Sequence, residues 1–400
     1  MRKGVLAGLA LLLVSPAALA ADPPERNLAL PVEVGAHWLW VGDVLLGRAA
    51  LFDGDTGRFL GQLPAGKGIV APHRSRDGRE LYLAETHYAR GTRGARTDLV
   101  SVTDAHTLAP LAEIEIPGKR SEHTSWVGGS ALSDDGGFLA VFNLNPATSL
   151  SIVDLAKRRF TVEVQIPGCG LVYPAGTRRF FSLCADGTAR VVTVDAEGGN
   201  PAVVSTARFF DAQADPLIEK GARAGDVWYF VTYRGVLHAI DVAGAEIGMG
   251  ESWPLLTDAE LAGGWRVGGP QNLALHAPSG RLFGLVNEGG DDAHKDPGKE
   301  VWVWDLAAHA RVQQIGLRSP AASFVLEQAG GLPGGAFDWL LQLVLPNDGV
   351  ERIVVTQDAA PLLFAATGFP STLAVYDATT GAHLRDVREV GVATSLIQLP

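Results

Sequence analysis

The sequence is poor in basic residues and has no long apolar run beyond its N-terminus. Its 400 residues hold 33 Lys and Arg against 44 Asp and Glu, which gives a formal net charge of −11 at pH 7. Nucleic acids and anionic membrane surfaces bind basic surfaces, so neither is an expected partner. After the first 20 residues no apolar run approaches the length that crosses a bilayer, and we expect no membrane-spanning segment.

Local catalytic and metal-binding motifs are also missing. The chain contains no Gly-x-Ser-x-Gly, no His-Glu-x-x-His, no phosphate-binding loop and no dinucleotide-binding fingerprint. Its ten His residues are scattered singly, without the spacing of metal ligands. We therefore predict no metal site and no catalytic residue in this chain acting alone, although residues distant in sequence can still assemble a site.

The N-terminus has the pattern of an export signal. Arg2 and Lys3 supply a basic start, residues 5–14 are apolar, and Ala18-Leu19-Ala20 forms a small-residue cleavage site. We predict a signal peptide over residues 1–20 and export of the mature chain to a bacterial periplasm.

Only two cysteines are present, Cys169 and Cys184. A turn sequence, Tyr173 to Gly176, lies midway between them, which places them at similar heights on adjacent antiparallel strands. In an oxidising compartment a disulfide is the favoured interpretation. The alternative, a metal or redox pair, has neither a Cys-x-x-Cys spacing nor a nearby His.

One recurring unit organises the rest of the chain: an alternating apolar run that ends in Asp. It ends at Asp53, Asp104, Asp154, Asp195, Asp241, Asp305 and Asp377. The intervals of 51, 50, 41, 46, 64 and 72 residues are near the period of four-stranded propeller blades. Each Asp can accept hydrogen bonds from the backbone of the following turn. We predict an all-β, seven-bladed β-propeller, with a solenoid or a sandwich as the alternatives.

The two ends of the chain and one late segment depart from the repeat. The first blade lacks its innermost strand, whereas the C-terminal "VATSLIQLP" is a strand without a partner. We therefore expect the C-terminal strand to close the ring, which removes two exposed sheet edges. Residues 326–349 read as an insertion in a single propeller domain over residues 21–400. Its apolar tip at Phe337, Trp339, Leu340 and Leu341 packs either on a partner or on its own blade.

Two polar loops are candidates for binding, because binding groups concentrate on loops held by a rigid scaffold. Arg90, Arg93 and Arg96 make a basic, Gly-rich loop, which is either a partner contact or a solvated hairpin tip. Residues 287–298 form a second loop, with His294 and Lys295 among acidic residues. Calcium binding there lacks any recognised ligand spacing.

Several segments together resemble one protein family. They are "RGARTDLVSVTDAHTLAPLAEIEIPG", "NPATSLSIVDL", "PGCGLVYPAGTRRFFSLCADGT", "LTDAELAGGWRVGGPQNLALH" and "HKDPGKEVWVWD", which follow one another along almost the whole mature chain. In this order they resemble the heavy, or alpha, chains of the tryptophan tryptophylquinone-dependent amine dehydrogenases, the methylamine and aromatic amine dehydrogenases.

The resemblance implies a heterotetramer of two heavy and two light chains. In that family the quinone cofactor resides in the light chain, which oxidises a primary amine to an aldehyde and ammonia and passes the electrons to a cupredoxin or a cytochrome. The heavy chain would hold no cofactor and would serve as a scaffold and as a wall of the amine channel.

One position departs from the family pattern. Methylamine dehydrogenase heavy chains present a Phe to the channel after the first blade, whereas this chain has Gly68 and Ile69 near the matching position. Other classes also stay open: a self-sufficient propeller enzyme such as a lactonase, or a periplasmic scaffold. A pyrroloquinoline quinone dehydrogenase is less well matched, because no Trp follows the Asp-x-x-Thr-Gly turns at Asp53 and Asp377.

Overall fold

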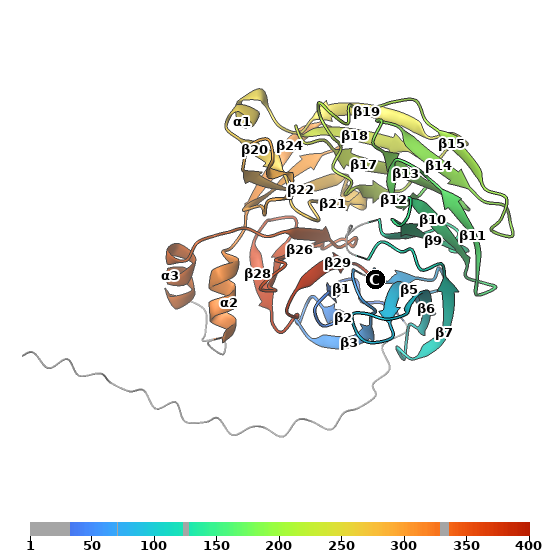
Figure 1. Cartoon of the computed structure of the whole chain (residues 1–400). Helices are drawn as coiled ribbons and strands as arrows, with labels where there is room; N and C mark the ends of the chain where they lie inside the picture. The colour runs from blue at the N-terminus through green and yellow to red at the C-terminus, as the bar shows by residue number, and fades with distance from the viewer. Residues whose placement is uncertain (1–32, 70, 123–127, 329–335) are drawn as a thin grey trace, which may run out of the picture.

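The described residues form seven antiparallel sheets arranged in a ring (Figure 1). The computed structural model describes residues 33–69, 71–122, 128–328 and 336–400, so the predicted signal peptide lies outside the described residues. Each sheet is one blade with four strands in a row, and the sixth blade has one additional strand. The predicted all-β, seven-bladed β-propeller is confirmed.

The strands are given from the axis outwards. Blade 1 contains β29 (Thr394–Gln398), β1 (Trp38–Asp43), β2 (Arg48–Asp53) and β3 (Phe59–Pro64). Blade 2 contains β4 (His73–Arg74), β5 (Glu80–Tyr88), β6 (Arg96–Asp104) and β7 (Pro110–Ile116). Blade 3 contains β8 (Ser130–Leu132), β9 (Phe138–Asn143), β10 (Ser149–Asp154) and β11 (Arg159–Gln165). Blade 4 contains β12 (Cys169–Pro174), β13 (Arg179–Cys184), β14 (Ala189–Thr193) and β15 (Ala202–Ser205).

The other three blades follow the same order. Blade 5 contains β16 (Ala222–Ala224), β17 (Val227–Val231), β18 (Val236–Asp241) and β19 (Gly248–Pro254). Blade 6 contains β20 (Trp265–Val267), β21 (Leu273–His276), β22 (Arg281–Glu288), β23 (Glu300–Asp305) and β24 (Ala310–Gly316). Blade 7 contains β25 (Arg352–Val355), β26 (Leu362–Ala366), β27 (Leu373–Asp377) and β28 (His383–Val387). Short helices α1 (Asp258–Ala262), η1 (Ala277–Ser279) and η2 (Ala293–Lys295) lie in connections of blades 5 and 6.

The C-terminal strand closes the ring, as the sequence predicts. Strand β29 pairs antiparallel with β1, and Trp40 is opposite Gln398. The side chain of Gln271, in blade 6, also holds β29: its amide donates to the Ile397 carbonyl at 2.8 Å, and its oxygen accepts from the Ile397 N–H at 3.2 Å. The chain therefore ends near the ring axis (Figure 1).

The core lies between the blades. In β9 all six residues are buried, because neighbouring blades cover both faces of the sheet. Leu139 and Val141 pack into the apolar cluster shared with blade 2, whereas Ala140 and Phe142 pack into the cluster shared with blade 4. Successive side chains of a strand point to opposite faces of the sheet, so each blade packs against the blade on either side of it. Repeating this packing in every blade forms the ring.

The strands alternate in direction, so their connections fall at two ends of the ring. We call the end that holds the first-to-second and third-to-fourth connections the turn face, and the other end the loop face. All seven repeat Asp residues lie on the turn face, and each accepts a hydrogen bond from a backbone N–H of the following turn at 2.7–3.0 Å. The recurring Asp is therefore a structural turn residue.

A histidine joins the first and last blades on the turn face. His37 Nδ1 lies 2.8 Å from Asp55 in blade 1, and Nε2 lies 3.2 Å from Asp358 in blade 7. Burial lowers the pKa of His37, but the hydrogen bonds and charges of the two carboxylates outweigh it, and the pKa is raised overall. Protonated His37 thus favours the closed ring.

The two cysteines form the favoured disulfide. Cys169 in β12 is opposite Cys184 in β13, with the two Cα atoms 3.9 Å apart. The late segment contains two helices, α2 (Pro320–Gln328) and α3 (Ala336–Val344), which connect β24 to β25 and lie beside the ring (Figure 1). Residues 329–335 of the predicted insertion lie outside the described residues.

Candidate partner-binding site on the loop face

Exposed large apolar side chains gather at one end of the ring. Among the described residues, ten lie in connections that leave the strands at the loop face, five of them in α2 and α3 beside the ring; seven lie on the outer fourth strands, and none lies in a turn-face connection. The loop-face apolar set is Leu45, Leu46, Leu144, Val325, Trp339, Leu340, Leu343, Val344, Phe369 and Val392. Exposed apolar surface of this kind marks interaction sites. The loop face is therefore the candidate binding face.

Helix α3 presents its apolar side to solvent. Trp339 is 65% exposed and Leu343 is 66% exposed. Its polar residues face the protein instead: Asp338 forms an ion pair with Arg318, and the Gln342 side-chain oxygen accepts from the Ser319 N–H at 2.8 Å. A surface helix usually has the opposite orientation. Of the other residues of the predicted tip, Leu340 is exposed and Leu341 is half-buried. The side chain of Phe337 lies outside the described residues.

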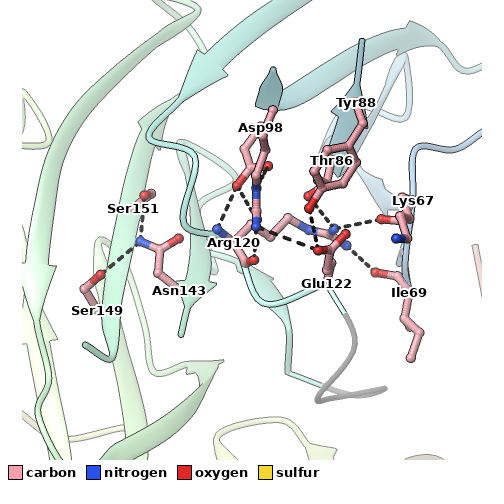
Figure 2. Close-up of polar contacts among 11 residues, drawn as sticks. Lys67, Ile69, Thr86, Tyr88, Asp98, Arg120, Glu122, Asn143, Ser149 and Ser151 are labelled. Carbon is pink, nitrogen blue, oxygen red and sulfur yellow. Dashed lines mark hydrogen bonds and ion pairs between the residues drawn. The ribbon is translucent and has the colours of Figure 1, made fainter. Parts of the chain in front are cut away.

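A buried arginine, Arg120, holds the backbone of the segment that contains Gly68 and Ile69. The Arg120 guanidinium donates to the carbonyl oxygens of Lys67 and Ile69 and to the Thr86 hydroxyl (Figure 2). Arg120 is only 4% exposed, and burial lowers its pKa to about 10, so it stays charged at neutral pH. A charged donor to buried carbonyls makes a strong hydrogen bond. Arg120 thus fixes the backbone of this loop.

A fully buried carboxylate balances the charge of Arg120. Asp98 accepts from the Arg120 backbone N–H at 2.7 Å and from both Nε and a terminal nitrogen of Arg96 at 2.8 Å. Arg96 also donates to the Arg120 carbonyl at 2.6 Å, and the Tyr88 hydroxyl donates to Glu122 at 2.8 Å. The hydrogen bond to Asp98 raises the pKa of Arg96, which is thus committed to this network. We call these residues the Arg120 network (Figure 2).

Gly68 is in close contact with the opposing loop. Its φ is 95°, which favours glycine, and a Cβ placed on it would lie 2.1 Å from the Glu122 carbonyl oxygen. The Ile69 N–H donates to that same oxygen at 3.1 Å. A residue with a side chain cannot replace Gly68 without moving the loop, so the identity of this residue is fixed by backbone packing.

The other predicted contact residues lie elsewhere on the same face. Arg93 is exposed at the tip of the loop between β5 and β6. His294 and Lys295 lie in η2 of blade 6, where the His294 ring stacks on Tyr233 with centroids 3.9 Å apart and bonds to its hydroxyl at 2.9 Å. Burial and two neighbouring lysines lower the pKa of His294. The structure therefore brings Gly68, Ile69 and Arg96 together, and it leaves Arg93 at one separate point and His294 with Lys295 at another.

Sequence reasoning did not find Arg120 or Asp98. Their partners are backbone atoms and side chains up to 53 positions away, as in the contact from Arg120 to Lys67. A lone Arg in a connecting segment gives no local signal of such a role. Among the described residues, no group of three or more His, Cys, Asp or Glu side chains is arranged to hold a metal ion, and none of the described helices could span a lipid bilayer.

The fold and this face define a class: a seven-bladed β-propeller with an apolar interaction surface at one end of its ring. The family model described as methylamine dehydrogenase heavy chain matches residues 43–329. The chain therefore belongs to the methylamine dehydrogenase heavy chain family, which confirms the resemblance seen in the sequence.

Relatives named methylamine dehydrogenase heavy chain support this over most of the chain. The protein from Paracoccus versutus is 31% identical over 352 residues, covering 87% of this chain and 74% of that protein. The protein from Methylorubrum extorquens is 27% identical over 388 residues, covering 95% of this chain and 86% of that protein.

Solved structures with low identity share the fold alone. A protein of unknown function from Desulfotomaculum acetoxidans has a TM-score of 0.57 at 14% identity, covering 90% of this chain and 98% of that one. A dihydro-haem d1 dehydrogenase has a TM-score of 0.54 at 17% identity, covering 95% of this chain and 78% of that one.

Proposed function

We propose that this chain is the non-catalytic heavy subunit of a periplasmic amine dehydrogenase and that a light chain docks on its loop face. The light chain would carry tryptophan tryptophylquinone, which accepts the electrons of a primary amine as the amine becomes an aldehyde and ammonia. The single observation that carries the proposal is the loop-face apolar set in a chain of this family. We propose two heavy and two light chains per assembly, with a cupredoxin or a cytochrome as the electron acceptor.

In this assembly the chain would act by shape and by excluding water. The segment from Lys67 to Ile69 would form part of the channel wall, kept rigid by the Arg120 network. Figure 2 shows the Ile69 side chain directed away from Arg120, so an aliphatic group is available to the wall. Because the Ile69 side chain is smaller than that of Phe, the channel would be wider there than one lined by a Phe. The exposed Arg93 and Lys295 would contact the light chain at the edge of the interface.

A pull-down from the native periplasm tests the subunit assignment. A tagged form of the chain should recover a small, Cys-rich partner with visible absorbance, and that absorbance should bleach when a primary amine is added. Recovery of the chain alone, colourless and unresponsive to amines, would instead support a stand-alone or scaffold propeller.

Charged substitutions on the loop face test where the partner binds. Leu45→Asp and Phe369→Asp, at positions that are 66% and 73% exposed, should each weaken light-chain recovery by about tenfold or more, because they place an unpaired carboxylate in an apolar interface. Val204→Asp is the matched control, since Val204 is 61% exposed but lies on the outer strand β15. Equal recovery with all three variants would show that the light chain binds elsewhere.

A further inference from the structure

The ring contains a cavity on its axis that the proposed function does not use. Its volume is about 420 Å³, and all seven blades contribute to its lining. Blades 1, 2, 3, 4 and 7 contribute residues of their innermost strands, blade 5 contributes Trp228, and blade 6 contributes Gln271. This volume is within the range of pockets that hold small organic molecules.

The described lining residues include no charged side chain. Most are apolar, such as Ala131, Val354 and Leu396. Tyr173 and Trp228 also contribute, but their polar ends are bonded elsewhere: the Tyr173 hydroxyl donates to the Glu219 carbonyl, and Trp228 Nε1 donates to the Pro174 carbonyl at 2.9 Å. These two aromatic side chains therefore offer apolar ring surface to the cavity.

His73 is a polar group with free hydrogen-bonding capacity in this lining. Its Nε2 lies 2.8 Å from the Ser130 hydroxyl, and its Nδ1 has no hydrogen-bond partner among the described residues. His73 is half-buried and lines the cavity. Burial lowers the pKa of His73 to about 4, so the imidazole is neutral at pH 7. A neutral ring nitrogen can bond an oxygen as donor or as acceptor, according to its tautomer.

We propose that the axial cavity binds a small neutral organic molecule with an apolar body and one hydroxyl or carbonyl oxygen, which bonds His73. An ammonium ion is disfavoured in this cavity. The described lining offers no carboxylate to pair with it, so its desolvation would not be compensated. The cavity therefore favours neutral molecules over ammonium ions, so it is not a storage site for amine substrates.

Calorimetric titration of the mature chain with two probes of nearly equal shape tests the charge selection. Benzyl alcohol should bind at one site per chain, and benzylammonium should bind at least about tenfold more weakly at pH 7, which corresponds to about 1.4 kcal/mol. Because neither probe needs a light chain or a quinone, failure here is distinguishable from failure of the proposed function. Equal affinities of the two probes would overturn the proposal.

Variants that fill the cavity test its location. Ala131→Leu and Val354→Phe both add side-chain volume at lining positions, and each should reduce benzyl alcohol binding by about tenfold or more. Ala202→Leu, on the exposed outer strand β15, is the matched control and should bind as the unaltered chain does. Two filling variants are used so that one remains if the other does not fold, as judged by circular dichroism. Undiminished binding in a folded filling variant would place the molecule outside this cavity.

Discussion

Replacing Arg120 by Met should destabilise the loop face measurably. The substitution keeps an unbranched apolar stem but removes the guanidinium that donates to the carbonyls of Lys67 and Ile69 and to the Thr86 hydroxyl. At 4% exposure, water cannot readily replace these donors. Each buried acceptor left without a donor costs about 1–3 kcal/mol, and Asp98 also loses a neighbouring positive charge. We expect the free energy of unfolding to fall by about 3 kcal/mol.

Urea unfolding followed by circular dichroism measures this loss, and hydrogen exchange locates it. The Ile69 amide, which donates to the Glu122 carbonyl at 3.1 Å, should lose protection in Arg120→Met. Arg120→Lys should be intermediate, because an ammonium cannot reproduce the planar set of donors. Arg93→Met, at an exposed arginine of the same face, is the control and should change stability by less than about 0.5 kcal/mol. If Arg120→Met matched this control in both measurements, the reasoning would be refuted.

Three further predictions concern stability. Cys169→Ser combined with Cys184→Ser opens a loop of 15 residues and should lower the free energy of unfolding by about 3 kcal/mol, and reductant should lower the urea midpoint of the unaltered chain but not of the variant. The folded chain raises the pKa of His37, so the contribution of protonated His37 to the free energy of unfolding is complete below pH 6.5 and is lost as pH rises through the raised value. The melting temperatures of His37→Asn and the unaltered chain should therefore differ more at pH 5.5 than at pH 9. His73 has its pKa lowered to about 4, so the unfolded chain binds more protons between pH 6.5 and 4, and stability should fall by about 2 kcal/mol on acidification to pH 5. His73→Gln should flatten that profile, and an unchanged slope would contradict the assignment.

The blade architecture was readable from the sequence because it depends on local signals. Each repeat Asp closes its own turn, and the two cysteines oppose each other across a single hairpin, so short windows of sequence carried the information. Ring closure was also predictable, because the first blade lacked its innermost strand and the C-terminal strand lacked a partner, so pairing the two removes both exposed edges. These features follow from strand periodicity and turn chemistry alone.

The candidate site was less predictable, because its parts meet only in the folded ring. Arg120 bonds a loop some 50 positions earlier in the chain, and nothing near it in sequence indicates a buried cation. Arg96 read as a loop-tip contact, but it lies at the start of β6 and is bonded to Asp98. Gly68, Arg93 and His294 share a face because the connections that hold them lie at the same end of the folded ring, and this is not visible in the sequence.

The position of β29 has a consequence for how the protein is made. The innermost strand of the first blade is the last strand to be synthesised, so the ring cannot close until translation reaches Thr394 and beyond. A chain truncated before Thr394 would keep an open edge on β1, which is a site for pairing with another chain. An affinity tag fused after Pro400 would begin beside the axis, where Gln398 and Leu399 line the cavity. Closure of the ring thus depends on the last residues of the sequence.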